Sequence, residues 1–400
     1  LLGGLAFSKI LENHGARMIA RQFLPGFKAW MHQKDMNIVL QEAHALKLCL
    51  PTTAVAGQLF NAMGGSDLRE QDSIAVLRLL ERMNGEMEVS GQPVSAVSTQ
   101  PSGESRYLPG QVRIGVIGLG VMGQPIVLNL LKKGYAVSVW ARRQESAATV
   151  LAAGADWADT PKALAAACDV VISIITSSED VRGVVQGTQM MPGLLAGARP
   201  GMVHIDMSTI APETARELAA CCAEQRVVFL DAPVSGGGVG AQNATLAIMA
   251  GGDEGSFQHV LPVLETLGKK IVHVGPSGAG QITKACNQMM LVCLIQACAE
   301  AARLASASGV DFARVREALL GGSAASRAVE IMGERMVKED FAAGIAARLH
   351  HKDFGLLMNT AFKSGCVLPI AAQVWQQLNQ LMACGLGEQD TSVLLRVMAR

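Results

Sequence analysis

One basic side chain stands near the start of a long, mostly apolar segment. Lys284 and Asn287 lie three residues apart in the stretch GAGQITKACN, so on a helix they would share a face. The segment continues without proline from 281 to 308 and is apolar nearly all round, which is typical of a buried helix. A lysine held there could give a proton to a substrate. The alternative is that its ammonium group reaches solvent from the first turns of the helix.

A second chemical signal is a glycine-rich turn between a predicted strand at 112–117 and a helical pattern at 125–133. In this context a GxGxxG turn lets backbone approach a pyrophosphate, which then faces the amides at the start of the helix. A merely structural turn is the weaker alternative, because the motif has its expected strand and helix on either side. The candidate phosphate-binding residues are Gly118, Leu119, Gly120, Val121, Met122 and Gly123.

The end of the next predicted strand, 136–140, indicates which dinucleotide would bind. An NAD-specific site carries Asp or Glu roughly 20 residues beyond the glycines, where it holds the ribose 2'-hydroxyl. Ala141, Arg142 and Arg143 stand at that place. Two cations and no acid suit a 2'-phosphate, so we expect NADP(H) to be preferred over NAD(H). The alternative is that both arginines are ordinary exposed charges.

Two further loops follow predicted strands. Ser208 and Thr209 come after a strand predicted to end at Asp206, and their hydroxyls could face a nicotinamide or cap the next helix. The stretch DAPVSGGG at 231–238 offers glycine amides beside the hydroxyl of Ser235. Such an amide cluster suits a carboxylate, although a flexible glycine-rich loop is the alternative.

The elements that must position these residues alternate between short apolar strands and helices. We expect strands at 112–117, 136–140, 170–175, 202–206 and 227–230, with helices at 161–167, 178–186 and 212–223. This pattern predicts an α/β fold with a Rossmann-type doubly wound parallel sheet, whose ligands bind beyond the carboxyl ends of the strands. An all-α domain should follow, with helices at 312–320, 324–338, 349–363, 371–383 and 392–399.

The chain also contains an internal repeat. Residues 1–82 align with 319–400 without a gap, so that Phe23 matches Phe341, Pro51 matches Pro369, and HQKD at 32–35 matches HHKD at 350–353. We therefore expect a partial all-α domain at 1–84, a linker at 85–110, an NADP-binding Rossmann domain at 111–276 and an all-α domain with the catalytic helix at 277–400. The partial domain has lost its own long helix, so its apolar face should dock on a helix like 281–308.

Composition excludes several classes of function. The 400 residues carry zero formal net charge and no strongly basic stretch, so a nucleic-acid partner is not expected. The nine cysteines form no CxxC and no metal-binding spacing with histidine, which predicts neither a metal site nor a disulfide framework. We find no uncharged apolar run of about 18 residues and no signal peptide pattern, so we expect no membrane segment and a cytoplasmic location.

Four motifs occur in one order: GLGVMG, DAPVSGG, GAGQITKACN and HKD. With them, residues 111–400 resemble the β-hydroxyacid dehydrogenase family, which contains 3-hydroxyisobutyrate dehydrogenases and tartronate semialdehyde reductases. Residues 1–84 resemble the last part of the same family's helical domain. The family often has Leu-Pro where Ile175 and Thr176 stand here, so contacts from that loop to a nicotinamide are not carried over.

The resemblance implies a role for each motif. Lys284 would be the catalytic residue and Asn287 its neighbour at the substrate. The remaining implied contacts are Ser235, Gly236 and Gly237 for the substrate carboxylate, and Thr209 and Lys352 for the cofactor. Such helical domains pack between subunits in the family, which implies a homo-oligomer, either a dimer or a tetramer.

These observations lead to one functional hypothesis and one alternative. The hypothesis is a hydride transfer between NADP(H) and a small carboxylated semialdehyde or 3-hydroxy acid, of the tartronate semialdehyde or 3-hydroxyisobutyrate type, with no metal required. The alternative is a catalytically silent dinucleotide-binding and assembly module. Joint presence of Lys284, Asn287 and Ser235 disfavours that alternative, because a scaffold has no use for the set.

Overall fold

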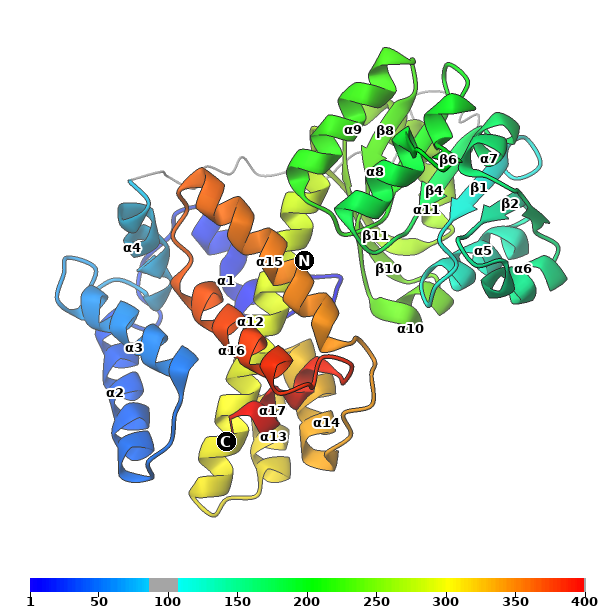
Figure 1. Ribbon diagram of the computed structural model, residues 1–400. Helices are drawn as coiled ribbons and strands as arrows, with labels where there is room; N and C mark the ends of the chain where they lie inside the picture. The colour runs from blue at the N-terminus through cyan, green and yellow to red at the C-terminus, as the bar shows by residue number, and fades with distance from the viewer. Residues whose placement is uncertain (86–106, 399–400) are drawn as a thin grey trace. The chain divides into compact units, whose positions relative to one another are not determined.

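The structure is a computed structural model that describes residues 1–85 and 107–398. Most of the predicted linker, 85–110, lies outside the described residues. The chain forms two compact units. The sheet unit holds the described residues from 107 through Cys286, and the helical unit holds those before 86 together with Asn287 onward. The division falls inside the longest helix, α12 (Ala279–Ala307), which is drawn in yellow in Figure 1.

The sheet unit is built on one large sheet with eight strands in its main order, β3-β2-β1-β4-β7-β8-β10-β11. All neighbours pair in parallel except β10, which is antiparallel to β8 and to the short β9. This order confirms the predicted α/β doubly wound fold. The strands are β1 (Arg113–Ile117), β2 (Ala136–Trp140), β3 (Asp156–Trp157), β4 (Val170–Ser173), β7 (Val203–Asp206), β8 (Val228–Asp231), β9 (Val234–Ser235), β10 (Leu246–Gly251) and β11 (Gly268–Gly275).

Five of the parallel strands end level with one another. Ile117 at the end of β1 lies opposite Trp140 on one side and Ser173 on the other. Ser173 lies opposite Asp206, and Asp206 lies opposite Asp231. The loops after these strands therefore leave one edge of the sheet together, as expected for a ligand site at the carboxyl ends.

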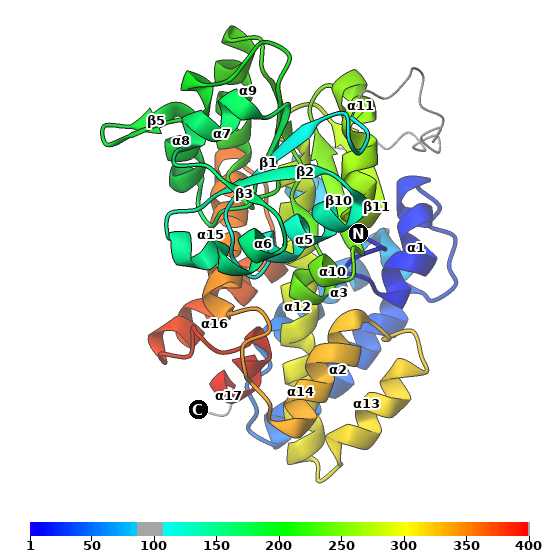
Figure 2. The same ribbon diagram turned by 90° about the vertical axis from the view of Figure 1, so that its right-hand side faces the viewer.

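Helices cover both faces of this sheet (Figure 2). One apolar cluster joins it to α5 (Gly123–Lys133), α6 (Ala148–Ala152), α10 (Gly237–Gln242) and α11 (Glu254–Glu265). A second cluster joins it to α7 (Pro161–Ala167), α8 (Ser178–Gln186) and α9 (Pro212–Glu224). Ile114 and Val116 of β1 lie in the first cluster and Ile117 in the second, so this strand is buried on both faces. A small hairpin of β5 (Gly187–Thr188) and β6 (Met191–Pro192) stands apart.

The helical unit confirms the predicted all-α part. Its C-terminal helices are α13 (Phe312–Leu320), α14 (Gly333–Lys338), α15 (Ala347–Ser364), α16 (Pro369–Ala383) and α17 (Leu394–Val397), with a 3-10 turn at Thr391–Val393. Its N-terminal helices are α1 (Lys9–Ile19), α2 (Ala29–Ala45), α3 (Pro51–Gly64) and α4 (Val76–Met83), with a 3-10 turn at Ser73–Ala75. Among the described helices, only α12 is long and apolar enough to span a membrane, and half of that stretch is buried inside the protein. It is therefore a core helix.

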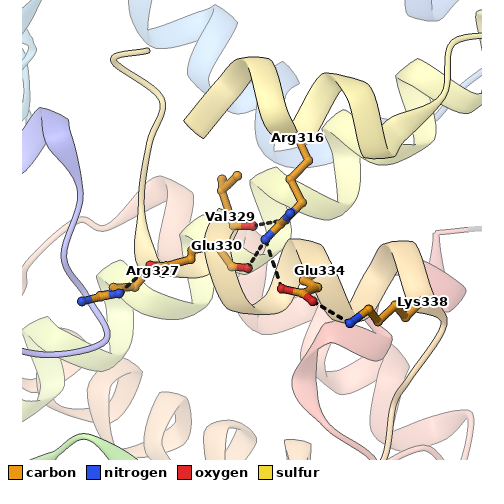
Figure 3. Close-up of polar contacts among 6 residues, drawn as sticks. All are labelled: Arg316, Arg327, Val329, Glu330, Glu334 and Lys338. Atoms are coloured by element: carbon orange, nitrogen blue, oxygen red, sulfur yellow. Dashed lines mark hydrogen bonds and ion pairs between the residues drawn. The ribbon is translucent and has the colours of Figure 1, made fainter. Parts of the chain in front are cut away.

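Two predicted helices differ from the structure: in place of the helix at 392–399 there is a 3-10 turn at Thr391–Val393 followed by the short α17, and 324–338 is not one continuous helix. The pattern at 324–338 predicted a continuous α-helix, but Ala328–Met332 form a π-helical turn before α14. Arg316 of α13 donates from Nε to the Val329 carbonyl at 3.0 Å and from Nη2 to the Glu330 carbonyl at 2.5 Å (Figure 3). The wider turn is thus stabilised by a side chain from another helix, which periodicity within the segment cannot reveal.

The internal repeat is visible in matching local contacts. Asp72 accepts a hydrogen bond from the Ile74 amide at 3.1 Å, and its counterpart Asp390 accepts one from the Ser392 amide at 3.0 Å. Equivalent arginines also lie over equivalent rings, Arg78 over Phe23 at 5.8 Å and Arg396 over Phe341 at 4.6 Å. Both copies therefore share these local contacts, but residues 10–14 lie in the α-helix α1 whereas the matching residues 328–332 form the π-helical turn.

Gly280 in the first turn of α12 should be intolerant of a side chain. A Cβ there would overlap the carbonyl oxygens of Asp231 and Met249. We expect Gly280→Ala to lower the free energy of unfolding by about 1–3 kcal/mol, as overpacking against backbone does. Denaturant titration of the purified protein measures this.

The matched control is Gly355→Ala on α15, where a Cβ would meet no described atom within 4 Å. There the helix propensity of alanine should raise the free energy of unfolding by up to ~1 kcal/mol. Equal effects of the two substitutions would contradict the packing assigned to Gly280.

Candidate active site

The glycine-rich turn after β1 has the geometry that a dinucleotide needs. Gly118 has a φ of 97°, and a Cβ there would overlap the Ile174 carbonyl oxygen. A Cβ on Gly123 would overlap the Gly118 carbonyl oxygen, so the start of α5 packs directly on the turn. A Cβ on Gly120 would meet no described atom within 4 Å. The second glycine therefore faces open space, where a pyrophosphate can approach backbone.

This turn lies beside the second glycine-rich loop. Val121 is exposed, and its Cγ1 would lie only 3.0 Å from a Cβ on Gly238. Asn129 of α5 donates from Nδ2 to the Ala241 carbonyl of α10 at 2.7 Å. Leu119 is buried in the core cluster and Met122 packs against it. The structure thus brings the predicted phosphate turn and the predicted carboxylate loop together.

Arg142 and Arg143 follow the end of β2 and are exposed. The Arg142 guanidinium lies 3.3 Å from the Asp180 carboxylate, and its side chain is 73% exposed. An exposed ion pair of this kind stabilises a protein only slightly, so the guanidinium can leave Asp180 and bind another anion. Both cations are therefore accessible at the place where a ribose phosphate is expected.

The loop after β7 is held by a serine rather than used as a helix cap. Ser208 Oγ donates to Asp206 Oδ1 at 2.7 Å and accepts from the Ile175 amide at 2.9 Å. The N-cap position of α9 belongs to Ala211, so the capping alternative for Ser208 and Thr209 is wrong. Thr209 is half-buried next to this bridge.

Asp206 belongs to a buried polar cluster at the ends of β4 and β7. Its Oδ1 also accepts from Ser173 Oγ at 2.7 Å, and Ser173 Oγ lies 2.8 Å from His204 Nε2. Because the single Ser173 proton goes to Asp206, His204 must donate from Nε2. Burial lowers the pKa of His204 to about 3, so the ring is neutral. Burial raises the pKa of Asp206 to about 6, and hydrogen bonds from Ser208 and Ser173 oppose that rise.

Asp231, at the end of β8, fixes the start of α12. Its Oδ1 accepts from the Gly278 amide at 2.7 Å and its Oδ2 from the Gln281 amide at 3.0 Å. A carboxylate at a helix N-terminus satisfies amides that have no partner within the helix. Burial raises the pKa of Asp231, while these amides lower it in part. The sequence pattern predicts Asp231 only as the first residue of a loop, although a buried strand ending in aspartate is a detectable signal.

The Gln281 side chain makes a second connection, which the sequence pattern does not predict. Its Oε1 accepts from the Ile210 amide at 3.1 Å, and its Nε2 donates to the Ser208 carbonyl at 2.9 Å. The first turn of α12 is thus bound to the loops after both β7 and β8. A glutamine beside two glycines, in GAGQ, was the available signal.

Lys284 lies one turn further along α12. Its side chain does not reach solvent, because only 7% of the residue is exposed. The Nζ atom donates to the Val234 carbonyl at 2.8 Å, directly before the buried Ser235. Gly236 and Gly237 then take φ values of 138° and 62°, which turn the chain sharply. The expected proton donor and the expected carboxylate loop are therefore neighbours.

Asn287 and Lys352 belong to a polar chain in the helical unit. Asn287 Nδ2 donates to Gln288 Oε1 at 3.0 Å, and Gln288 Nε2 donates to Asp353 Oδ2 at 2.6 Å. Lys352 Nζ lies 3.1 Å from the other Asp353 oxygen. Within the described residues, the buried Oδ1 of Asn287 has no hydrogen-bond partner. The predicted contacts of Asn287 with a substrate and of Lys352 with a cofactor stay predictions.

The described residues contain no group of three or more His, Cys, Asp or Glu side chains that could hold a metal ion. The nine cysteines, which all lie within the described residues, form no disulfide.

Comparison with known proteins identifies both halves of this architecture. Residues 113–275 match the NAD binding domain of 6-phosphogluconate dehydrogenase. Residues 1–80 and 278–398 both match the family described as NAD-binding of NADP-dependent 3-hydroxyisobutyrate dehydrogenase. The second match falls on the internal repeat.

Individual relatives agree with these families. The chain is 37% identical over 287 residues to 2-hydroxy-3-oxopropionate reductase of Escherichia coli K12, covering 72% of this chain and 97% of the relative. It resembles a structure of Mycobacterium tuberculosis 3-hydroxyisobutyrate dehydrogenase with L-serine, with a TM-score of 0.67, 32% identity, and coverage of 72% and 99%. It also resembles Psf3 in complex with NADP+ and 2-OPP, with a TM-score of 0.66, 26% identity, and coverage of 71% and 99%.

Asp206 should give the fold a measurable pH dependence. The folded protein favours the neutral acid, so this contribution is complete below the ordinary pKa of 3.8 and is lost as pH rises through about 6. Asp206→Asn mimics the neutral acid. We expect its free energy of unfolding to rise relative to the parent between pH 4 and 7, by up to roughly 3 kcal/mol at ~1.4 kcal/mol per pKa unit.

Urea titrations at each pH measure this difference. Asp253→Asn is the control, because hydrogen bonds from Ser256 lower the pKa of Asp253, so its contribution to stability is complete above pH 3.8 and is lost only as pH falls below that value. If the difference in the free energy of unfolding between Asp206→Asn and the parent does not change from pH 4 to 7, the buried carboxyl is not neutralised.

Proposed function

This chain belongs to the β-hydroxyacid dehydrogenase family, and on that premise we propose that it transfers a hydride between NADP(H) and a small carboxylated semialdehyde or 3-hydroxy acid. Substrates of the tartronate semialdehyde or 3-hydroxyisobutyrate type fit best. Family membership makes the chain an NAD(P)-dependent oxidoreductase, which removes the support for a catalytically silent module. The proposal is carried by the buried Lys284 ammonium group held beside Ser235.

Lys284 would act as the proton donor in reduction. A carbonyl that accepts a hydride develops negative charge on its oxygen, so a positively charged donor within hydrogen-bond reach lowers the barrier. The bond to the Val234 carbonyl fixes the ammonium group next to the substrate loop. In oxidation the same nitrogen would take the proton back from the hydroxyl group of the substrate.

The loop of Ser235, Gly236 and Gly237 would hold the carboxylate of the substrate. Its hydroxyl group and backbone amides are suitable donors for a carboxylate. Fixing the acid end limits where the reacting carbon can lie relative to Lys284, and such positioning lowers the entropic cost of the reaction. Asp231 and Gln281 support this geometry by anchoring the first turn of α12.

The turn at 118–123 fits a dinucleotide, because Gly120 faces open space and the other two glycines permit close packing. A bound nicotinamide dinucleotide supplies or accepts the hydride. The preference for NADP(H) rests on Arg142 and Arg143 and on the absence of an acid at 141–143. A solved relative in complex with NADP+ supports it further. We propose Thr209 as an additional cofactor contact from the loop after β7.

Replacement of Lys284 tests the chemical step. We expect Lys284→Ala to lower kcat by about 10² to 10⁴, the range for one general acid or base, while the affinity for NADPH changes little. Lys284→Met fills nearly the same volume and should lose as much activity, which separates chemistry from packing. Steady-state kinetics with tartronate semialdehyde, together with NADPH binding by fluorescence, provide both values. Activity of either variant within a few-fold of the parent would refute the role.

Cofactor choice is tested separately at the end of β2. The parent should prefer NADPH to NADH, and Arg142→Ala with Arg143→Ala should mainly raise the KM for NADPH because phosphate contacts are lost. Ala141→Asp should instead favour NADH by adding an acceptor for the 2'-hydroxyl. Arg182→Ala, which removes an exposed ion pair with Glu217, is the control. A parent that uses NADH equally well would contradict the argument from the missing acid.

A further inference from the structure

The described N-terminal residues, 1–85, and the C-terminal residues 319–398 are here called the N-repeat and the C-repeat. They meet at matching positions within the helical unit. Ser8 and Ser326, which are equivalent in the repeat, form an antiparallel bridge. The Lys9 amide donates to the Ala325 carbonyl at 2.9 Å, and the Arg327 amide donates to the Phe7 carbonyl at 3.1 Å. Each of these bonds is the image of the other when the two repeats are exchanged.

A second contact shows the same exchange. Helix α3 of the N-repeat packs against α16 of the C-repeat, and these helices begin at the equivalent residues Pro51 and Pro369. Contacts of a residue or helix with its own counterpart characterise a two-fold interface between identical copies. The Ser8–Ser326 bridge and the α3–α16 contact therefore both follow the pattern of a dimer interface, although the two repeats belong to one chain.

Glu300 of α12 binds the first turn of α3 in the N-repeat. Its Oε1 accepts from the Thr52 amide at 2.8 Å, and its Oε2 accepts from the Thr53 amide at 2.9 Å and from Thr53 Oγ1 at 2.6 Å. Glu300 is 2% exposed, so the carboxylate is buried against the first turn of α3. Leu50, at the N-cap of α3, gives no side-chain cap in the described structure. Glu300 thus supplies from another helix the acceptor that α3 lacks.

The start of α16 in the C-repeat matches the start of α3 that Glu300 binds in the N-repeat. Leu368 at the N-cap of α16 likewise gives no side-chain cap in this part of the chain. In a pair of complete copies, the Glu300 of each could accept the first amides of α16 in the other, at the positions that match Thr52 and Thr53.

We propose that the N-repeat substitutes for a second copy of the chain, by occupying the two-fold surface around Ser326, α16 and Glu300 through which two C-repeats pair. Released from this surface, the C-repeat pairs with the C-repeat of another copy. The inference rests on contacts within the helical unit and is independent of the proposed reaction.

Two substitutions in the full chain loosen the N-repeat without touching the surface that would pair. Lys9→Pro removes the amide that donates to Ala325, and position 9 is the first residue of α1, where proline is tolerated. Thr53→Val removes the hydroxyl that donates to Glu300 while it keeps the shape of the side chain. Ser256→Ala, which removes a hydroxyl bonded to a capping carboxylate in the sheet unit, is the matched control.

Amide hydrogen exchange and sedimentation equilibrium together decide the proposal. In the double variant we expect the α3 amides to exchange at least tenfold faster and the association constant between chains to rise at least tenfold, with no change in either for the control. Faster exchange without stronger association would overturn the proposal, as would weaker association, which would mean that the N-repeat itself joins chains. Unchanged exchange would also overturn it, because the two contacts would then not hold the N-repeat in place.

Discussion

The buried carboxylate of Asp231 is the interaction on which the site depends. It joins the end of a sheet strand to the first turn of α12, and Gln281 repeats that connection to the neighbouring loop. This arrangement needs close backbone contact, which explains why a Cβ on Gly280 would overlap two carbonyl oxygens. Lys284 then lies one turn beyond a fixed point, so the direction of its side chain is set by the sheet rather than by its own flexible stem.

A second constraint is the level ending of the parallel strands. Ser173, Asp206 and Asp231 end three neighbouring strands, and all are buried. Placing polar groups at this edge costs desolvation free energy unless each has partners. In the sheet unit, serine hydroxyls donate hydrogen bonds to Asp206 and backbone amides donate to Asp231, which offsets part of this free energy. The raised pKa of Asp206 also favours its neutral form, which is less costly to bury. These polar groups hold the loop after β7, which carries Thr209.

Sequence predicted much of this molecule because local patterns determined it. The strands at 136–140 and the helices at 161–167, 178–186 and 312–320 begin and end where predicted, since proline, glycine and alternation marked their limits. The strands β10 and β11, the capping role of Asp231 and the π-helical turn at 328–332 were not predicted. Each depends on a partner far away in the chain: a neighbouring strand, the start of α12, or Arg316. Periodicity within a segment carries no information about such partners.

The bridge between Ser8 and Ser326 has a consequence for how this surface responds to dilution and to mutation. An interface between separate chains weakens as protein concentration falls, whereas a contact within one chain is first order and persists at any concentration. In a pair of identical chains every substitution also appears on both sides of the axis. Here the two sides are encoded separately, so one can change while the other stays fixed. Thr53 and its counterpart Ala371 differ in this way, and of the two only Thr53 carries a hydroxyl, which donates to Glu300.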